Sequence, residues 1–579
     1  MASFVESQRE AIDDKPVELL AELFYDRFFY NDLISSHDDA QLASANMLAM
    51  LAFPGLLCLH WIPKYYVTLK GAPEAELALS VLGDRFFWLT FQMGVLGLVT
   101  TLQWERLFPD RRDYAILGPQ PVTARVLFQA QAWALARFMA FHFAIANVAA
   151  AAFFPIAALP WTAGTLSAVA FAVGHWLSLV AVALFVVMVV AAMQGVLSNV
   201  LTPTAFDRVS PVAQALLMTL FLGMIILLPL MQMEVLAGVD TVHLLLDQSE
   251  LAWWFPSMWF SALGEFVAGR GAGLGPLALA AVSSLFAVAV LTAGSYLLSY
   301  TRFLRRSLES PRRSRAMESR LARRLGGLVR RVFVADASER AVFLFTVKTL
   351  LRSRQQRLYL GAFLAVGCAL VVAQTWALSA PSAPSHLLLA QPYVLLFLTL
   401  VGMRVVFSFP ADLPAQWAFR FHAKPEFDRY LTGIRKALWM MGPGPLLCAT
   451  TVGFLMFWGP QTAAVHLLVL GVCSWLSVEI ILARFTKIPF TCNHVSGGAH
   501  VIIVWTFCAV GMLTYSGLFA SIEMWVFKGT LQLALFAVGT GALAVAWKRV
   551  QPEFAPDPAG PIFHEDNHPV VHRLNLYDD

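Results

Sequence analysis

Long apolar stretches separated by short polar loops dominate this sequence and limit what it can fold into. A helix needs about 20 apolar residues to cross a hydrocarbon core about 30 Å thick. Charged residues make up only 13% of the chain, against roughly 25% in soluble domains, which excludes an ordinary globular enzyme. We therefore predict an all-α, polytopic membrane protein with about twelve transmembrane helices, near residues 42–62, 86–103, 134–158, 165–198, 213–235, 275–300, 357–378, 386–409, 435–458, 463–482, 499–520 and 525–547.

The lysines and arginines fall mainly in every second loop. Loops that stay on the cytoplasmic side of a membrane carry an excess of these residues. The basic loops follow the second, sixth, eighth and tenth stretches, whereas the loops after the third, seventh and ninth hold almost no charge. Twelve crossings with both termini in the cytoplasm satisfy this pattern. Lys64 and Lys70, in the first outer loop, are a mild exception.

A basic run after the sixth stretch divides the predicted helices into two halves of six. Two interpretations of this run stay open: a solvated linker, or a segment that contacts anionic lipid headgroups. Nucleic-acid binding is not expected, because aromatic residues are not interleaved with the arginines and no reader motif accompanies them. The predicted parts are a cytoplasmic N-terminus with an interfacial helix (1–41), a first six-helix half (42–300), a basic cytoplasmic linker (301–340), an interfacial helix with a second six-helix half (341–547) and a cytoplasmic tail (548–579).

Each half opens with a segment whose apolar residues recur at helical spacing among charged ones. These segments are residues 17–34 and 341–357. The pattern is typical of amphipathic helices that lie in the membrane interface. We therefore expect each half to begin with an interfacial helix.

The first cytoplasmic loop, residues 102–128, mixes aromatic residues with charges of both signs. Pro109 breaks a helix, and Pro119 and Pro121 beside a glycine favour a defined turn. The stretch between them suits a short helix along the membrane that presents charges to a soluble partner, although an ordinary connector is the alternative. The candidate partner-binding residues are Trp104, Glu105, Arg106, Asp110, Arg111, Arg112 and Asp113.

This loop resembles the coupling region of type 2 ABC exporter permeases. There, an end of the second helix that contains Trp and Glu leads through a stretch rich in Arg and Asp into a proline turn before the third helix. The resemblance covers chiefly the first half and implies a permease docked onto separate ATPase subunits, two copies, which hold ATP and magnesium. The matching residues are Trp104, Glu105, Arg111, Arg112, Leu117, Pro119 and Pro121.

The outer segment between the fifth and sixth stretches, residues 251–269, is rich in aromatic residues. Such rings favour the headgroup depth of a bilayer, so an interface anchor is one interpretation. Permeases of the family have re-entrant helices here, and the resemblance implies one in this chain. A gate over a path for a lipid-like substrate is therefore the second interpretation. The candidate residues are Trp253, Trp254, Trp259, Phe260 and Glu265.

Two further cytoplasmic loops carry candidate residues. The loop 407–439 offers a second docking surface through Trp417, Arg420, Asp428 and Arg429. The loop 485–500 holds Cys492, His494 and His500. A metal site needs several ligands held together, and this spacing favours a structured loop instead.

Several chemical motifs are absent from the sequence. It has no GxxxxGK[ST] phosphate loop, HExxH or GxSxG, so any ATP hydrolysis is expected on a partner chain. Charges within the stretches are few: Arg137, Arg404 and Glu479 lie near predicted helix ends. The histidines at positions 142, 175 and 466 are isolated in the sequence. Ion-coupled transporters normally need a set of buried ionisable groups. Ion-coupled transport, like an enzyme embedded in the membrane, is therefore the less favoured reading.

The sequence and the resemblance together predict a function. We expect a multi-pass permease subunit of an ABC-type exporter in the bacterial cytoplasmic membrane, which is not itself an enzyme and holds no cofactor. Its substrate is unidentified, with a lipid-like or hydrophobic molecule as the candidate class. The alternative is a non-catalytic membrane scaffold or accessory subunit of a larger complex. The partners expected are ATPase subunits and membrane lipids, with no nucleic acid.

Overall fold

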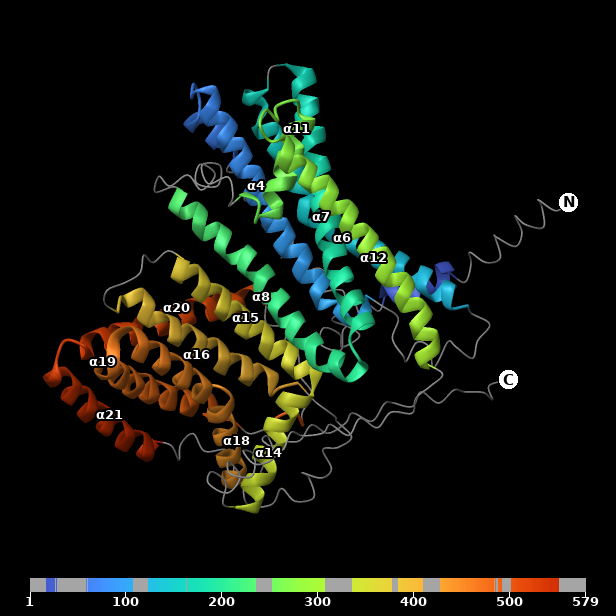
Figure 1. Ribbon diagram of the computed structural model, residues 1–579. Coiled ribbons are helices and arrows are strands. Elements are labelled where there is room, and N and C mark those ends of the chain that lie inside the picture. The colour runs from blue at the N-terminus through green and yellow to red at the C-terminus, as the bar shows by residue number, and fades with distance from the viewer. Residues whose placement is uncertain are drawn as a thin grey trace, which may run out of the picture. The chain divides into compact units, whose positions relative to one another are not determined.

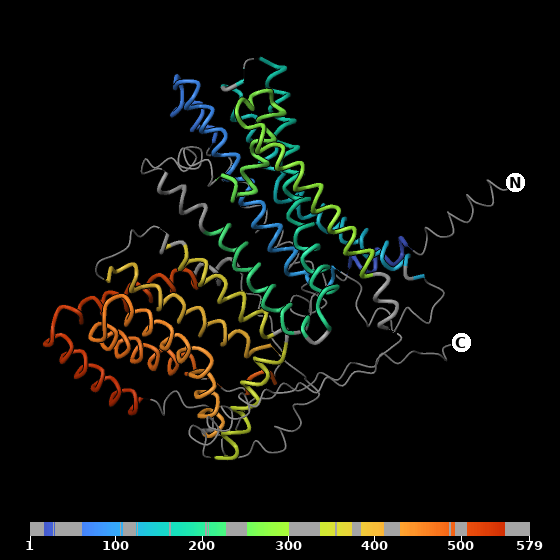
Figure 2. Tube along the Cα trace, in the orientation of Figure 1, coloured from blue at the N-terminus to red at the C-terminus, as the bar shows by residue number. Residues whose placement is uncertain are grey.

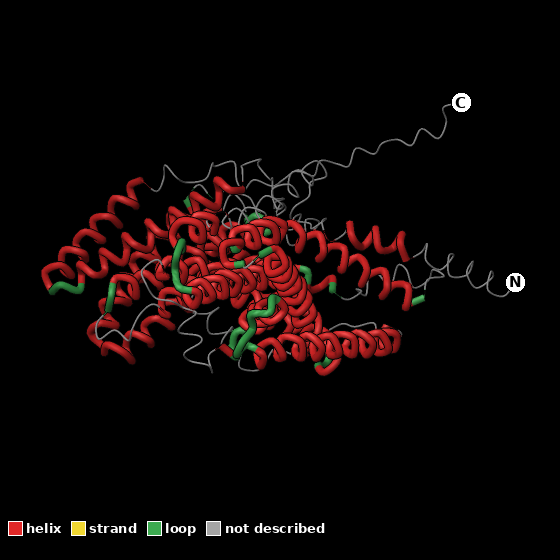
Figure 3. The backbone as a smooth tube through the Cα atoms, turned by 90° about the horizontal axis from the view of Figure 1, so that it is seen from above, coloured by secondary structure: helices red, strands yellow, loops and turns green. Residues whose placement is uncertain are grey.

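Two compact units, Met1–Ser314 and Arg315–Asp579, make up the chain in the computed structural model. The boundary between them falls within the predicted basic linker, residues 301–340. All regular elements in the described part are helices, as Figure 3 shows. The structure describes residues 17–26, 28, 59, 61–107, 123–162, 164–235, 252–307, 336–376, 384–409, 427–483, 485, 488–491 and 501–550.

The first unit is built around α4 (Glu74–Leu102), whose side chains from Val81 onward are almost all buried. The longer helices α6, α7 and α8 and the short α11 pack on it, and α12 packs on α7 and α11 (Figure 1). Short elements complete the unit, and its helices have these bounds: α3 (Trp61–Pro63), η2 (Lys64–Thr68), η3 (Trp104–Arg106), α6 (Ala124–Ala157), η4 (Leu159–Trp161), α7 (Thr165–Val200), α8 (Pro203–Val235), α11 (Pro256–Val267) and α12 (Gly275–Ser307).

A helix at residues 17–26 packs on the first unit, as the amphipathic pattern predicts. Ala21, Phe24 and Phe28 are buried against α4 and α6, and Phe28 stacks on Phe138. Leu19, on the same helix, is 69% exposed. One face is therefore held by the unit, while an apolar side chain on another face stays uncovered.

The second unit pairs α16 with α15 and α20, and packs α14 on α18. Asp336 caps the start of α14 by accepting from the backbone amide of Ala337. Glu339 and Lys436 form an ion pair between α14 and α18. The helices are α14 (Ala337–Arg352), α15 (Arg354–Trp376), α16 (His386–Val406), α18 (Phe427–Met441), α19 (Pro443–Leu482), α20 (Val501–Val526) and α21 (Thr530–Val550).

The element α19 consists of two helical arms that fold back on each other as a hairpin. Gly459 has φ 83°, outside the helical region, and Pro460 follows it. Phe454 and His466 stack with ring centroids 3.8 Å apart, although twelve residues of straight helix would separate them by about 18 Å. The chain therefore turns back at Gly459, and its path can be followed in Figure 2. This agrees with two predicted spans that meet near residue 460.

Nine helices in the described part are long and apolar enough to cross a membrane, or ten if the bent pair α14–α15 counts as one span. The chain thus has the helices of a multi-pass membrane protein. Two of the twelve predicted spans are not counted separately here. Most of 42–62 lies outside the described residues, and the two arms of α19 are counted as part of one helix.

Several predicted boundaries were wrong. The helices that contain the third and fifth spans begin about ten residues before the predicted spans, at Ala124 and Pro203, because polar residues in their first turns are compatible with a helix. The Thr123 hydroxyl caps α6 by accepting from the amide of Val126. The predicted span 435–458 is divided at Gly442, so its first residues belong to α18.

Candidate functional site

Arg85 and Glu265 form a buried ion pair in the first unit. Arg85, on α4, is fully buried, and its Nη1 lies 2.8 Å from Oε1 of Glu265 on α11. The guanidinium also lies over the ring of Phe171, at 4.7 Å from its centroid. An isolated charge in an apolar interior is very costly, so such charges are paired. The pair therefore fixes α11 to α4.

Small residues let α11 approach closely enough for this pair. A Cβ atom at Gly174 of α7 would collide with the carbonyl oxygen of Gly264 on α11. A Cβ atom at Gly264 would lie only 2.6 Å from Nη1 of Arg85. Ser178 of α7 donates to the carbonyl oxygen of Phe260 at 2.8 Å. These contacts hold the backbone of α11 directly against its neighbours.

A second carboxylate, Asp84, lies next to Arg85 on α4. Lys64 lies 2.8 Å from its Oδ1, and the Tyr65 hydroxyl donates to Oδ2 at 2.7 Å. Burial raises the pKa of the Tyr65 hydroxyl well above its ordinary value, and the negative charge of Asp84 adds to the shift. Lys64 was an exception to the expected excess of basic residues in cytoplasmic loops. In the fold it forms an ion pair with Asp84.

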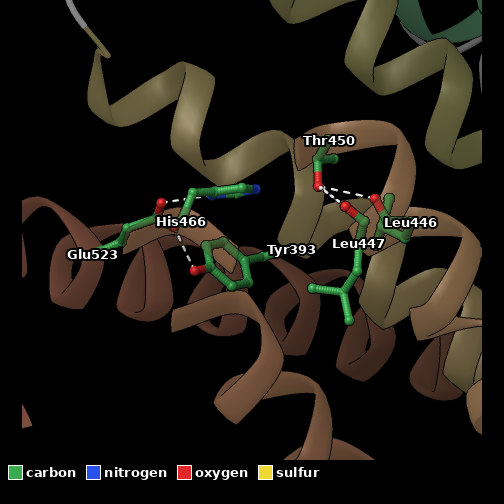
Figure 4. Close-up of polar contacts among 6 residues, drawn as sticks. All are labelled: Tyr393, Leu446, Leu447, Thr450, His466 and Glu523. Carbon is green, nitrogen blue, oxygen red and sulfur yellow. Dashed lines mark hydrogen bonds and ion pairs between the residues drawn. The ribbon is translucent and has the colours of Figure 1, made fainter. Parts of the chain in front are cut away.

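The second unit buries a carboxylate with different partners (Figure 4). Glu523 of α20 is fully buried. The Tyr393 hydroxyl, from α16, donates to its Oε2 at 2.6 Å, and Nδ1 of His466, from α19, lies 2.6 Å from its Oε1. Both carboxylate oxygens are therefore occupied by protein groups. We call these three residues the Glu523 cluster.

The hairpin of α19 places His466 in this cluster. Phe454, on the other arm, stacks on the imidazole with an interplanar angle of 8°. The other ring nitrogen, Nε2, is buried and has no hydrogen-bond partner in the described part of the chain. The hydroxyl of Thr450, drawn beside it in Figure 4, donates to the backbone of its own helix.

These findings correct the expectation that a set of buried ionisable groups is absent. His466 is isolated only in the sequence, since its partner Glu523 follows 57 residues later. Arg85 lies one residue before the predicted second span, 86–103, and was missed. The adjacent Asp84 and Arg85 within an apolar run are a signal that could have revealed this site, because ionisable residues within membrane spans commonly mark function.

The predicted docking residues of the first loop are only partly described. Trp104 is fully buried and donates to the Ser210 hydroxyl of α8 at 2.9 Å, so its ring offers no surface to a partner. Arg106 is partly exposed, and its carbonyl oxygen accepts from Gln131. The side chain of Glu105 lies outside the described residues, as do Asp110, Arg111, Arg112 and Asp113.

The second predicted docking surface is described only at one end. Arg429, on α18, is exposed, and its Nη1 lies 3.4 Å from Oδ2 of Asp336. Asp428 belongs to the same helix, but its side chain lies outside the described residues. Trp417 and Arg420 also lie outside them, together with Cys492, His494 and His500.

The aromatic segment of the first unit divides into exposed and buried residues. Trp253 and Trp254 are exposed, the latter by 81%, whereas Trp259 is partly buried. Phe260 is fully buried and packs on Phe185. Glu265 is buried as the partner of Arg85. Exposed rings thus precede α11, while α11 itself is anchored in the core.

The described residues contain no group of three or more His, Cys, Asp or Glu side chains that could hold a metal ion. Comparison with known proteins gives no further assignment: no family model, curated protein or solved structure matches the chain.

Proposed function

We propose that this chain is the membrane permease subunit of an ABC-type exporter and that separate ATPase subunits drive it. The proposal rests on the sequence resemblance in the loop 102–128 together with one structural observation, the short helix α11. The substrate class we propose is hydrophobic or lipid-like.

Helix α11 carries the structural part of this proposal. Its twelve residues extend about 18 Å, too little to cross a hydrocarbon core about 30 Å thick. Yet α11 is packed against three long helices, α4, α7 and α12, and Glu265 near its end is buried. A short helix held at membrane depth by protein contacts is what a re-entrant segment requires. It lies where the family resemblance implies such a segment.

The exposed rings beside α11 support a lipid-like substrate. Trp253 and Trp254 precede the helix and expose large apolar surfaces. Aromatic rings of this kind suit the boundary between headgroups and hydrocarbon. A substrate that leaves through this boundary would pass these exposed rings.

In this proposal the ATPase subunits, two copies, bind ATP and magnesium and contact the cytoplasmic loops. Arg111 and Arg112 are the candidate contacts in the first loop, and Arg429 is a candidate in the second. Movement of the ATPase subunits would change the populations of two transporter conformations through these contacts.

The test is purification from native membranes in mild detergent. We expect a nucleotide-binding subunit in stoichiometric amount, and a more than tenfold loss of its co-purification in the variant with Arg111→Glu and Arg112→Glu. The matched control reverses another adjacent pair, Arg312→Glu with Arg313→Glu, and should retain the subunit. A stoichiometric assembly without any ATPase would instead support the scaffold function. An intact complex in the variant with Arg111→Glu and Arg112→Glu would show that these two arginines are not the ATPase contact.

A further inference from the structure

We propose that the Glu523 cluster is a proton-binding site within the second unit. This function goes beyond the proposed exporter role and does not depend on an ATPase partner. Three observations support it: complete burial, partners that can themselves titrate, and an imidazole nitrogen without a partner.

The charge of the cluster gives it an affinity for protons. With Glu523 ionised and His466 neutral, carrying its proton on Nδ1, the cluster has a net charge of −1. No lysine or arginine pairs with Glu523 in the described part of the chain. A buried, uncompensated charge is costly, and the uptake of one proton would neutralise it.

The surrounding helices offer few other groups that could neutralise this charge. Helix α16 contributes Tyr393, and α19 contributes His466 and Cys473, which lies near Tyr393. Tyr515, on α20 itself, bonds Ser477 at 2.7 Å instead. Lys528 is exposed in the turn after α20, and the basic residues of α21, Lys548 and Arg549, lie at its other end. None of these groups is positioned to neutralise the charge of Glu523 in place of a proton.

The proton is taken up by His466. In the Nδ1–H tautomer, Nε2 of His466 carries a lone pair. That nitrogen is buried and has no hydrogen-bond partner among the described residues. Uptake forms the Nε2–H bond and breaks an O–H bond of hydronium, which leaves as water. The Nδ1–H bond to Glu523 is kept, so the cluster goes from −1 to neutral as a hydrogen-bonded ion pair.

A metal cation fits the cluster less well than a proton. Alkali and alkaline-earth cations need several oxygen ligands with free lone pairs. Both oxygens of Glu523 already accept hydrogen bonds at 2.6 Å, and the unpartnered atom is a nitrogen. The chemistry of the free position thus favours a proton.

The cluster lies close to one end of each helix that builds it. Tyr393 lies seven residues after the start of α16, His466 six after Pro460, and Glu523 three before the end of α20. The first two positions are about 10 Å from a helix end and the third is about 5 Å from one. These ends all belong to loops that the predicted topology places on the outer side. At the same end, the exposed His386 contacts the Ser521 hydroxyl of α20 at 3.0 Å. The cluster is therefore within reach of protons from that side.

The experiment is an infrared pH titration of the full chain in lipid nanodiscs. We expect the imidazole signal of His466 to change with pH in the wild type, together with a shift of the Glu523 carboxylate band, and both changes to be absent in Glu523→Gln. The control Tyr515→Phe removes a partly buried hydroxyl of the same unit that bonds Ser477 and none of the three cluster residues, so it should keep the signal unchanged. Identical difference spectra for the wild type and Glu523→Gln would overturn the proposal.

A second variant covers the case in which Glu523→Gln fails to fold. His466→Gln removes the imidazole that takes up the proton but leaves Glu523 and Tyr393 in place. The pH-dependent imidazole signal should then be lost, as it is in Glu523→Gln. A His466→Gln protein that keeps the signal of the wild type and of Tyr515→Phe would also refute the proposal.

Discussion

Each unit of this chain buries a glutamate between helices, but the partners differ in kind. Glu265 of the first unit pairs with Arg85, whose guanidinium stays charged at all accessible pH values. Glu523 of the second unit contacts Tyr393 and His466, and an imidazole, unlike a guanidinium, has both a neutral and a charged form in proteins. The Arg85–Glu265 pair therefore attracts constantly, whereas the Glu523 cluster can change its net charge.

The difference shows how partner choice decides what a buried carboxylate can do. Glu265 holds a helix too short to cross the membrane, a task that needs a constant attraction. Glu523 lies between long helices that are already packed together, so in our proposal the net charge of the Glu523 cluster is free to vary through His466. Substitutions at Arg85, Tyr393, Gly174 and Lys64 test this contrast, with expected effects that decrease in that order.

Replacing Arg85 by methionine should have the largest effect. It leaves Glu265 buried without a counter-charge, at a cost of about 3 to 5 kcal/mol in the free energy of unfolding. Chemical unfolding in detergent, followed by tryptophan fluorescence, measures this cost. The double variant Arg85→Met with Glu265→Met removes both charges and should recover most of the loss. A double variant as unstable as the single one would show that Arg85 acts by packing alone.

Replacing Tyr393 by phenylalanine should cost about 1.5 to 3 kcal/mol, because a hydrogen bond to a charged carboxylate is lost. The matched change Tyr515→Phe removes a bond between two neutral hydroxyls and should cost about 0.5 to 1.5 kcal/mol. The same unfolding assay compares them at neutral pH. Equal losses of unfolding free energy in the two variants would indicate that Glu523 is already protonated at neutral pH. The carboxylates of the two units would then differ less in charge than proposed.

Replacing Gly174 by alanine should cost about 1 to 3 kcal/mol, because the new methyl group meets the backbone of α11. The change tests whether the Arg85–Glu265 pair depends on that close approach. Gly471→Ala, on α19, is the control, since no atom lies within 4 Å of its added Cβ. If both alanine variants unfold at the same denaturant concentration, α11 is free to shift and its fastening is weaker than proposed.

Replacing Lys64 by methionine should have the smallest effect, about 1 kcal/mol, since partly exposed ion pairs contribute little. The Lys64 side chain is 29% exposed, and Asp84 keeps its bond to Tyr65. Comparison with Arg85→Met in the same assay shows how strongly the contribution of an ion pair to the free energy of unfolding depends on its burial. A loss as large as that of Arg85→Met would contradict this scaling.

The sequence predicted the helices better than the sites. Apolar length located the described spans, and the glycine and proline near residue 460 marked the turn of α19, because these features are local. Boundaries at Ala124 and Pro203 were missed, since polar first turns do not end a helix. The contact of Tyr393 with Glu523 spans 130 residues of sequence and depends on how three helices pack. No periodicity within one helix contains that information.

The buried ring of Trp104 has a mechanical consequence. It joins the end of α4 to α8 at the point where the loop 102–128 begins. Arg85 lies on α4, about 26 Å from the Leu102 end of that helix. If the loop is the ATPase contact of the proposed function, a force applied to it is transmitted along α4 to the half of the helix that holds α11. Trp104 would then be the residue that keeps the loop end of α4 fixed to α8 during that movement.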